Sequence, residues 1–388
     1  MKLTPGTITG AAADGLAAEA SGLDQAGTLL DAAALSGLLH REVTITHVRS
    51  KPGHSLVAAH TDLHGAAGWT MLTGDPVKYH NAAQRAADFG KELQVHQASG
   101  SHFFSGTVWT DPQLAKELAE ARAVLGEETP WRVLRYNPRR RVVAAVQTGS
   151  SQKVLRVVAH GAAGLLNTAR RWRSQGLPVT NVSPLGRRGS ATIAALWGVS
   201  DLGRAPHPPA AETAGAAIAK LHAVPARQPD LGRRNPDPHR AAKGLVDVAP
   251  WLEGRASRLA AELEDRLAAL PHRAAAQIHG DLSPDQVVLG DYQSHKIRLI
   301  DLDRAGWGSP MRDVGSWIAA CRRDEQLQLI DPFLTGYTAH SHVKPHDLDV
   351  WEATAHLAGA ADFFRHREPD WPARTIRALD LTEEALNR

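Results

Sequence analysis

The stretch that most constrains the fold of this chain is residues 277–303, which read QIHGDLSPDQVVLGDYQSHKIRLIDLD. A short β-prone segment leads into the His-Gly-Asp triplet at 279–281, and a turn with Pro284 and a second β-prone run follow. After a polar turn, a third β-prone run ends in Asp301 and Asp303. The pattern therefore predicts acidic side chains at strand ends, beside loops.

This arrangement suits phosphoryl transfer, which needs one carboxylate to orient a hydroxyl and oxygen ligands to hold Mg²⁺ across the phosphates. Asp281 is the candidate for the first role, and Gln286 with Asp301 for the second. Asp303 is a candidate ligand of a second metal ion, and His279 a candidate brace for the catalytic loop. An isolated triplet of this kind also arises by chance, and an Asp at a strand end is usually a turn or cap residue.

The complete spacing resembles the aminoglycoside phosphotransferase and choline kinase family of small-molecule kinases. Their motif has His-Gly-Asp, four residues, Asn, and then Ile-Asp-x-Asp or Ile-Asp-x-Glu about twenty residues later. Gln286 stands at the Asn position here, which resembles the maltokinase branch with its His-Gly-Asp-x-x-x-x-Gln-Val-Leu motif. The resemblance implies an α+β, protein kinase-like bilobal fold, with a small β-rich N-lobe and a helical C-lobe, that uses ATP and Mg²⁺.

Composition narrows the classes further. A length of 388 residues predicts two or three domains, and a net charge of +3 with a pI of about 9.1 suits an anionic ligand such as a nucleotide. No Lys/Arg block indicates nucleic-acid binding. The single cysteine, Cys321, excludes internal disulfides and Cys-based metal clusters and fits a reducing compartment. Without an apolar leader or a run of about 20 apolar residues, we expect a soluble, cytoplasmic protein without membrane contact.

We expect three parts: an N-terminal α/β cap domain over residues 1–128, a kinase-like N-lobe over 129–200, and a helical C-lobe over 201–388 with the catalytic and metal motifs. An extra N-terminal cap is also what the maltokinase resemblance implies.

A weak repeat links the first two parts. Arg49, Pro52 and the run 57–59 recur 86 positions later as Arg135, Pro138 and the run 143–145. Chance and duplication both explain so short a match. If it is a duplication, the first 128 residues contain a strand meander like the one that follows.

Three predicted strands between residues 131 and 158 resemble the first three strands of a kinase N-lobe. Their first turn, which includes Arg139, would lie over the nucleotide phosphates. A solvated hairpin tip explains the arginines of this turn equally well. In this family the third strand supplies a cation, for which Arg156 is the candidate and Lys153 the second choice. The next predicted helix, 165–174, should carry a Glu partner for it, yet residues 149–200 contain no acidic residue; Asn167 is a possible substitute.

Two further expectations concern the C-terminal half. Residues 225–250 are rich in Pro, Arg and Asp and predict a long loop. Asp313 predicts the N-cap of a helix over 314–322. The remaining helices resemble those that form the acceptor pocket in this family.

The sequence therefore favours an ATP-dependent O-phosphotransferase, a small-molecule kinase that acts on a hydroxyl of a sugar, amino sugar or aminoglycoside. The alternative is a catalytically weak, kinase-like protein that binds a nucleotide or ligand for regulation, which the missing glutamate favours. We expect a small-molecule substrate as the partner and a monomer or homodimer. The acceptor and the choice of ATP over GTP do not follow from the sequence.

Overall fold

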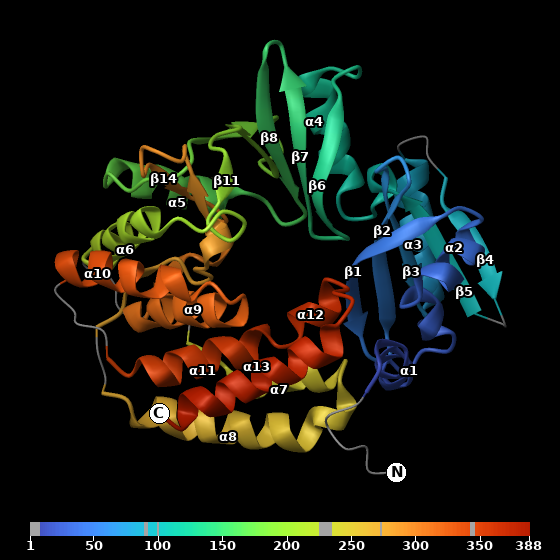
Figure 1. Cartoon of the computed structure of the whole chain (residues 1–388). Helices are drawn as coiled ribbons and strands as arrows, with labels where there is room; N and C mark the ends of the chain where they lie inside the picture. The colour runs from blue at the N-terminus through green and yellow to red at the C-terminus, as the bar shows by residue number, and fades with distance from the viewer. Residues whose placement is uncertain (1–7, 89–91, 99–100, 225–234, 272–273, 342–345) are drawn as a thin grey trace.

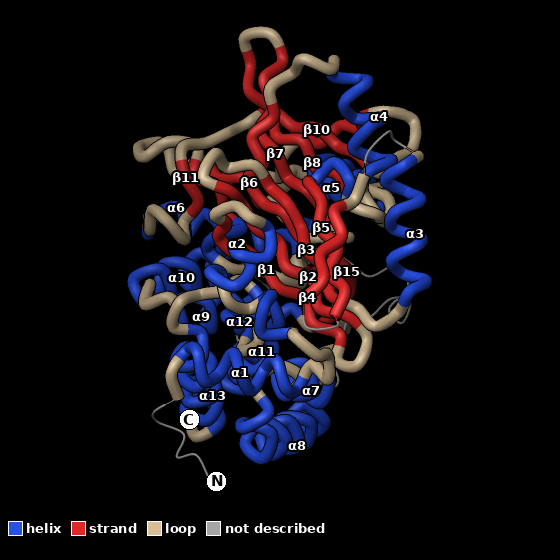
Figure 2. Tube along the Cα trace, turned by 90° about the vertical axis from the view of Figure 1, so that its right-hand side faces the viewer, coloured by secondary structure: helices blue, strands red, loops and turns tan. Residues whose placement is uncertain are grey.

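The computed structural model describes residues 8–88, 92–98, 101–224, 235–271, 274–341 and 346–388. It confirms the predicted α+β class: two five-stranded antiparallel sheets are followed by a largely helical part that also carries two small sheets (Figure 1). Seen from the side in Figure 2, the strands occupy the upper half of the molecule and most helices the lower half.

The first sheet has the strand order β1-β2-β3-β5-β4. Its strands are β1 (Val43–Lys51), β2 (Ser55–Asp62), β3 (Ala67–Leu72), β4 (Gln94–Ala98) and β5 (Ser101–Thr107). The helices and 3₁₀ turns of this part are α1 (Gly10–Ala20), η1 (Ala26–Leu29), α2 (Ala32–Leu39), α3 (Pro76–Ala87) and η2 (Val108–Thr110). The next helix, α4 (Ala115–Leu125), contacts strands of the second sheet. Asp31 and Asp75 begin α2 and α3 as N-caps, accepting backbone N–H groups with their side chains.

The second sheet has the same topology, with the order β6-β7-β8-β10-β9. Its strands are β6 (Trp131–Asn137), β7 (Arg141–Thr148), β8 (Ser151–Val158), β9 (Val182–Leu185) and β10 (Ala191–Ala195). Helix α5 (Ala163–Ser174) connects β8 to β9 along the chain. In each sheet three strands precede a helix and two more strands. Arg49 pairs with Val57 across β1 and β2, as Arg135 pairs with Val143 across β6 and β7. The meander expected from the weak sequence repeat is therefore present.

The helical part includes residues 277–303, which lie between two of its helices along the chain. Its strands and 3₁₀ turns are β11 (Ser200–Asp201), η3 (Pro250–Leu252), β12 (Ala276–Ile278), η4 (Pro284–Gln286), β13 (Val287–Leu289), β14 (Ile297–Leu299), η5 (Leu302–Arg304), β15 (Gly306–Gly308) and η6 (Leu327–Leu329). Its helices are α6 (Pro208–His222), α7 (Pro238–Val246), α8 (Glu253–Ala269), α9 (Pro310–Arg323), α10 (Ile330–His340), α11 (Leu348–Gly359), α12 (Asp362–Arg365) and α13 (Trp371–Leu386).

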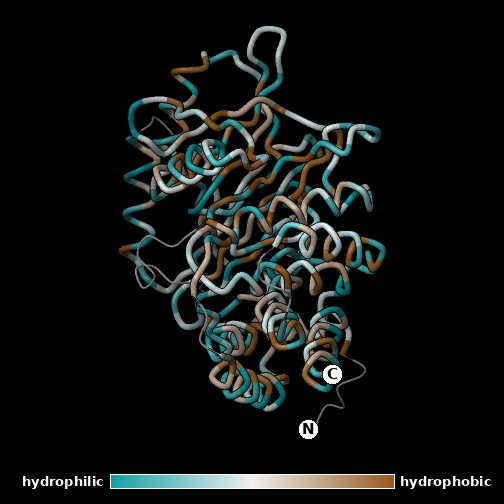
Figure 3. Tube along the Cα trace, turned by 90° about the vertical axis from the view of Figure 1, so that its left-hand side faces the viewer, coloured by the Kyte–Doolittle hydropathy of each residue, from teal (hydrophilic) through white to brown (hydrophobic). Residues whose placement is uncertain are grey.

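The first sheet joins the other two parts of the molecule, because both of its faces are buried. Side chains alternate across a strand, so Leu56 and Ala58 of β2 enter a core shared with α8, α11 and α13. Val57 and Ala59 enter a second core shared with β6, β7 and β8. The brown, hydrophobic segments in Figure 3 concentrate on the strands in the middle of the molecule. The first sheet thus ties the second sheet to the helical part.

One expectation about the helical part is wrong. Residues 225–250 predict a loop, but α7 lies within this range and the turn η3 begins at its last residue, Pro250; residues 225–234 are outside the described residues. Asp237 caps α7 by accepting the Arg240 N–H at 2.8 Å, and Pro238 occupies the first helical turn. Among the described residues, no helix is long and apolar enough to cross a membrane.

Candidate functional site

The His-Gly-Asp triplet forms the loop between β12 and η4. His279 is fully buried, and its Nε2 donates to the Ile300 carbonyl at 2.9 Å. This bond links the loop to Ile300, which follows the last residue of β14 and precedes Asp301. The brace role expected for His279 therefore has a geometric basis: it holds the segment of Asp281 against the segment of Asp301.

Gly280 is required by its backbone, because its φ is +82° and an added Cβ would overlap the carbonyl group of Arg304. We expect Gly280→Ala to lower the free energy of unfolding by more than about 1 kcal/mol, measured by urea denaturation. The matched control is Gly254→Ala in α8, where nothing lies within 4 Å of the added Cβ and helix propensity favours Ala. Equal effects of both substitutions would contradict this account of the loop.

Asp313 organises the same loop from α9. Its fully buried carboxylate accepts the backbone N–H of His279 at 2.6 Å and that of Gly280 at 2.8 Å. The imidazole of His222 lies 3.2 Å away. The prediction of Asp313 as an N-cap is wrong: the N-cap of α9 is Ser309, and α9 has already begun at Pro310. The N-cap prediction considered only the local sequence, whereas the partners of Asp313 lie 33 to 91 positions away along the chain.

Asp281 lies at the mouth of this loop. Its Oδ1 accepts a hydrogen bond from Nη1 of Arg304 at 2.6 Å, and 41% of its side chain is exposed. Burial raises the pKa of Asp281, and the charge of Arg304 counteracts part of that rise. Asp301 also contributes to the rise, so the two carboxylates are electrostatic neighbours. A partly exposed carboxylate with a raised pKa can accept a proton from a hydroxyl group.

Of the three predicted metal ligands, Gln286 directly precedes β13, and Asp301 and Asp303 follow the end of β14. The Nε2 of Gln286 donates to Asp285 at 3.0 Å, which anchors the side-chain amide. Its backbone carbonyl accepts the Ile300 N–H, so Gln286 is held beside the residue that precedes Asp301. Asp301 has a left-handed backbone conformation with φ of +57°, which is uncommon for a residue other than glycine and typical of functional sites.

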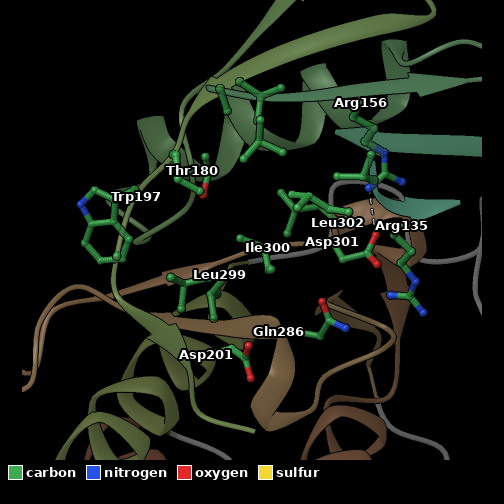
Figure 4. A pocket seen from close by; sticks show the side chains of 18 of the residues that line it. Arg135, Arg156, Thr180, Trp197, Asp201, Gln286, Leu299, Ile300, Asp301 and Leu302 are labelled. Carbon is green, nitrogen blue, oxygen red and sulfur yellow. Dashed lines mark hydrogen bonds and ion pairs between the residues drawn. The ribbon is translucent and has the colours of Figure 1, made fainter. Parts of the chain in front are cut away.

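A cavity of about 460 Å³ lies between the second sheet and the strands β13 and β14, which we call the motif strands. Its walls are mostly apolar and include Val143, Val154, Ala194 and Leu299. Arg135, Arg156 and Asp301 lie together at one end, as Figure 4 shows, and Trp197 lies at the opposite end. Gln286 lines the same cavity. Its size is in the usual range for a small-molecule site.

The structure separates the three predicted cofactor-binding residues. Arg156 lines the cavity, together with Val154 two positions before it on β8. Lys153 does not, because strand alternation puts it on the face of Leu155 and Val157, which point into a hydrophobic core.

Arg139 does not line the cavity either. Its backbone N–H donates to the buried carboxylate of Asp111 at 2.6 Å, and its Nη1 approaches the sulfur of Met71 at 3.5 Å. Instead, Arg141 and Arg135 reach the cavity. The sequence analysis considered Arg141 only as part of the arginine run of the first turn and missed Arg135. Arg141 lies two positions before Val143 on β7, and Arg135 pairs with Val143 across β6 and β7, so alternation along the strands was a usable signal.

The acidic partner expected for Arg156 comes from elsewhere in the chain. Its Nη1 lies 3.2 Å from Asp301 Oδ1, and its Nη2 contacts Asp303. Asn167, the possible substitute, accepts from Arg170 at 3.5 Å instead. Burial raises the pKa of Asp301, but the charges and hydrogen bonds of Arg141 and Arg156 outweigh it, so the pKa lies below its ordinary value. Asp301 therefore stays ionised.

Comparison with known proteins agrees with this geometry. Residues 192–356 match the phosphotransferase enzyme family (APH). A search of curated proteins finds no significant match.

Several solved structures share the fold. A microcompartment-associated aminopropanol kinase has a TM-score of 0.56 at 18% identity, over 70% of this chain and 98% of that chain. An amicoumacin kinase solved with AMP-PNP and Ca²⁺ has a TM-score of 0.53 at 14% identity, over 69% and 93%. A choline/ethanolamine kinase family protein from Mesorhizobium loti has 0.52 at 15%, over 71% and 94%. The expected kinase-like α+β fold is therefore confirmed.

Proposed function

Because residues 192–356 match the phosphotransferase enzyme family, we propose that this protein transfers the γ-phosphoryl group of ATP to a hydroxyl of a small polar molecule. The observation that carries the proposal is the cavity of about 460 Å³, which joins an apolar slot to a cluster of arginines and carboxylates. An apolar slot suits a purine ring, and guanidinium groups suit phosphate oxygens. We also propose the division into a cap domain (1–128), an N-lobe (129–200) and a C-lobe (201–388).

The purine would lie between Val143 and Val154 of the second sheet and Val288 and Leu299 of the motif strands, which line the cavity from both sides. Arg156 would then be at the phosphate end, where Figure 4 shows it beside Asp301. A planar guanidinium binds phosphate oxygens with two parallel hydrogen bonds.

The donor set fits Mg²⁺, which prefers oxygen ligands and is typically held by one or two carboxylates together with phosphate oxygens and water. Asp301 and Asp303 would supply carboxylate oxygens, and Gln286 its amide oxygen. When bound, Mg²⁺ neutralises the charge that develops on the phosphoryl group. The described residues contain no group of three or more His, Cys, Asp or Glu placed to hold a metal ion, so the proposed site depends on the amide and on the nucleotide itself.

Asp281 would accept the hydrogen bond of the acceptor hydroxyl and take its proton as the bond from this oxygen to the γ-phosphorus forms and the bond from the γ-phosphorus to the departing ADP breaks. His279 and Asp313 would position Asp281 by holding the loop from both sides, through the Ile300 carbonyl and the two loop N–H groups. Arg304, paired with Asp281, would offset part of the rise that burial causes in the pKa of this carboxylate.

For the acceptor we propose a sugar, amino sugar or aminoglycoside. The support for a sugar is Gln286, which occupies the position where the maltokinase branch also has Gln. We propose a cytoplasmic monomer or homodimer. The solved relatives with the same fold act on an aminopropanol or bind amicoumacin, as their names state, which supports a small-molecule acceptor.

A regulatory nucleotide-binding protein is the second candidate. The observation that favours it is the pairing of Arg141 and Arg156 with Asp301, a proposed metal ligand.

The experiment that separates the two candidates is transfer from [γ-³²P]ATP with Mg²⁺ over a panel of neutral sugars, amino sugars and aminoglycosides. We expect a labelled acceptor in at least one class, and no label when EDTA replaces Mg²⁺. Measurable ATP binding without any labelled acceptor would favour the regulatory candidate.

A further inference from the structure

Four charged side chains meet at the phosphate end of the cavity. Arg141 Nη1 lies 3.1 Å from an oxygen of Asp301 and 3.1 Å from an oxygen of Asp303. Arg156 contacts the same two carboxylates, with Nη1 3.2 Å from Asp301. The arginines come from β7 and β8, and the acids follow β14, so these ion pairs connect the second sheet to the motif strands. We call these four residues the charge cluster.

The charge cluster is neutral, with two guanidinium groups and two carboxylates. Only 17% of the Asp301 side chain and 13% of the Arg156 side chain are exposed, so water screens their interaction weakly. While a carboxylate oxygen accepts hydrogen bonds from guanidinium N–H groups, the lone pairs involved are not free to coordinate a metal ion. A divalent cation placed beside two fixed guanidinium groups would also be repelled by them.

A bound nucleotide would change this balance, because its phosphates would offer the arginines another anionic partner and free the carboxylates of Asp301 and Asp303. Conversely, a metal ion on those carboxylates would free Arg141 and Arg156 for the phosphates. The Nε of Arg156 is buried and has no hydrogen-bond partner among the described residues, so this guanidinium has a donor still to satisfy.

We propose that Arg141 and Arg156 exchange partners: they hold Asp301 and Asp303 before the nucleotide binds, and they hold nucleoside di- or triphosphate oxygens when those carboxylates bind a divalent cation. Metal ion and nucleotide then bind cooperatively, each favouring the other. This inference rests on the proposed function. It assigns to Arg141 a nucleotide-binding role that neither the family match nor the sequence motif contains.

The test measures binding and requires no turnover. The affinity of the full-length protein for AMP-PNP is determined by calorimetry with saturating Mg²⁺ and with EDTA, and the affinity for Mn²⁺ alone by electron paramagnetic resonance. Coupling between two sites is typically about 5- to 150-fold. We expect wild-type protein to bind AMP-PNP at least about tenfold more tightly with Mg²⁺ than with EDTA, within that range.

Arg141→Ala should reduce this ratio to less than about threefold and strengthen the binding of Mn²⁺ alone, because one competitor for the carboxylates is gone. Arg132→Ala is the matched control: Arg132 is an exposed arginine of β6 that does not line the cavity, and its removal should change neither value. If Arg141→Ala does not fold, Arg141→Lys, which keeps the charge without the planar fork, should give an intermediate ratio.

The outcomes are distinguishable. Absence of AMP-PNP binding to the wild-type protein would refute the proposed function itself. AMP-PNP binding with the same affinity in Mg²⁺ and EDTA would overturn only the exchange of partners. An unchanged ratio and unchanged Mn²⁺ affinity in Arg141→Ala, with wild-type coupling present, would assign the coupling to other residues and overturn the role of Arg141.

Discussion

Asp281→Asn is expected to reduce phosphoryl transfer by at least about 100-fold while changing nucleotide affinity by less than about threefold, because removal of a general base usually costs 10²- to 10⁴-fold. The side chain lies outside the residues that line the cavity, so the nucleotide site should keep its shape. Asn is isosteric and can still pair weakly with Arg304, so the loop should persist. Steady-state kinetics with the best acceptor of the panel, together with calorimetry for AMP-PNP, check both values.

The matched control for this substitution is Asp291→Asn. Asp291 is an exposed residue of the loop between β13 and β14, where its side chain accepts hydrogen bonds from the N–H groups of Gln293 and Ser294. An Asn side chain can accept the same bonds, so the transfer rate should stay within about twofold of wild type. A turnover of Asp281→Asn equal to that of Asp291→Asn would refute the assigned role of Asp281.

Asp313→Ala is expected to lower the free energy of unfolding by about 3–5 kcal/mol, the usual cost of removing one partner of a buried charge network. The substitution leaves the N–H groups of His279 and Gly280 without their acceptor inside a fully buried site. His222 keeps its hydrogen bond to the hydroxyl of Tyr337, so the damage should concentrate on the catalytic loop. Urea denaturation monitored by tryptophan fluorescence measures the effect.

Asp331→Ala is the matched control, since Asp331 is exposed in the first turn of α10 and its loss should cost less than about 0.5 kcal/mol. Similar destabilisation by both substitutions would show that the network around Asp313 contributes nothing specific.

We also expect Asp313 to make the free energy of unfolding depend on pH. Burial raises the pKa of Asp313, but the hydrogen bond and charge of His222, the charge of His279 and the N–H of Gly280 outweigh it, so the folded-state pKa lies below its ordinary value. A lowered folded-state pKa stabilises the fold above the unfolded-state value of about 4, and this contribution is lost as the pH falls through the folded-state pKa. Between pH 6 and pH 3, wild-type protein should therefore lose more stability than Asp313→Ala in parallel urea titrations. Identical pH profiles would contradict the lowered pKa.

The sequence predicted the fold class and the motif strands because their signals are local. The β-prone runs and turn residues around Asp281 and Asp301 specify strand and loop without help from distant residues, and Gly280 marks the turn. The repeated strand order of the two sheets was also detectable, since Arg49 and Arg135 lie in equivalent pairs, but few identical residues remained to show it.

What the sequence could not predict depends on contacts between distant segments. The partners of Arg156 are 145 and 147 positions away, so a search for a nearby glutamate had to fail. Asp313 looks like a helix cap in its local context, and only the tertiary structure brings it to the catalytic loop. Lys153 and Arg139 were plausible by their positions in the predicted third strand and first turn, but the strand pleat and the backbone bond to Asp111 direct them elsewhere.

The most direct test of the central claim is a crystal structure of the protein with AMP-PNP and Mg²⁺. The account predicts the purine between Val143 and Leu299, the phosphates against Arg156, and the metal ion bound by Asp301 and Gln286. A nucleotide bound outside this cavity, or a metal ion bound away from both Asp301 and Gln286, would contradict it.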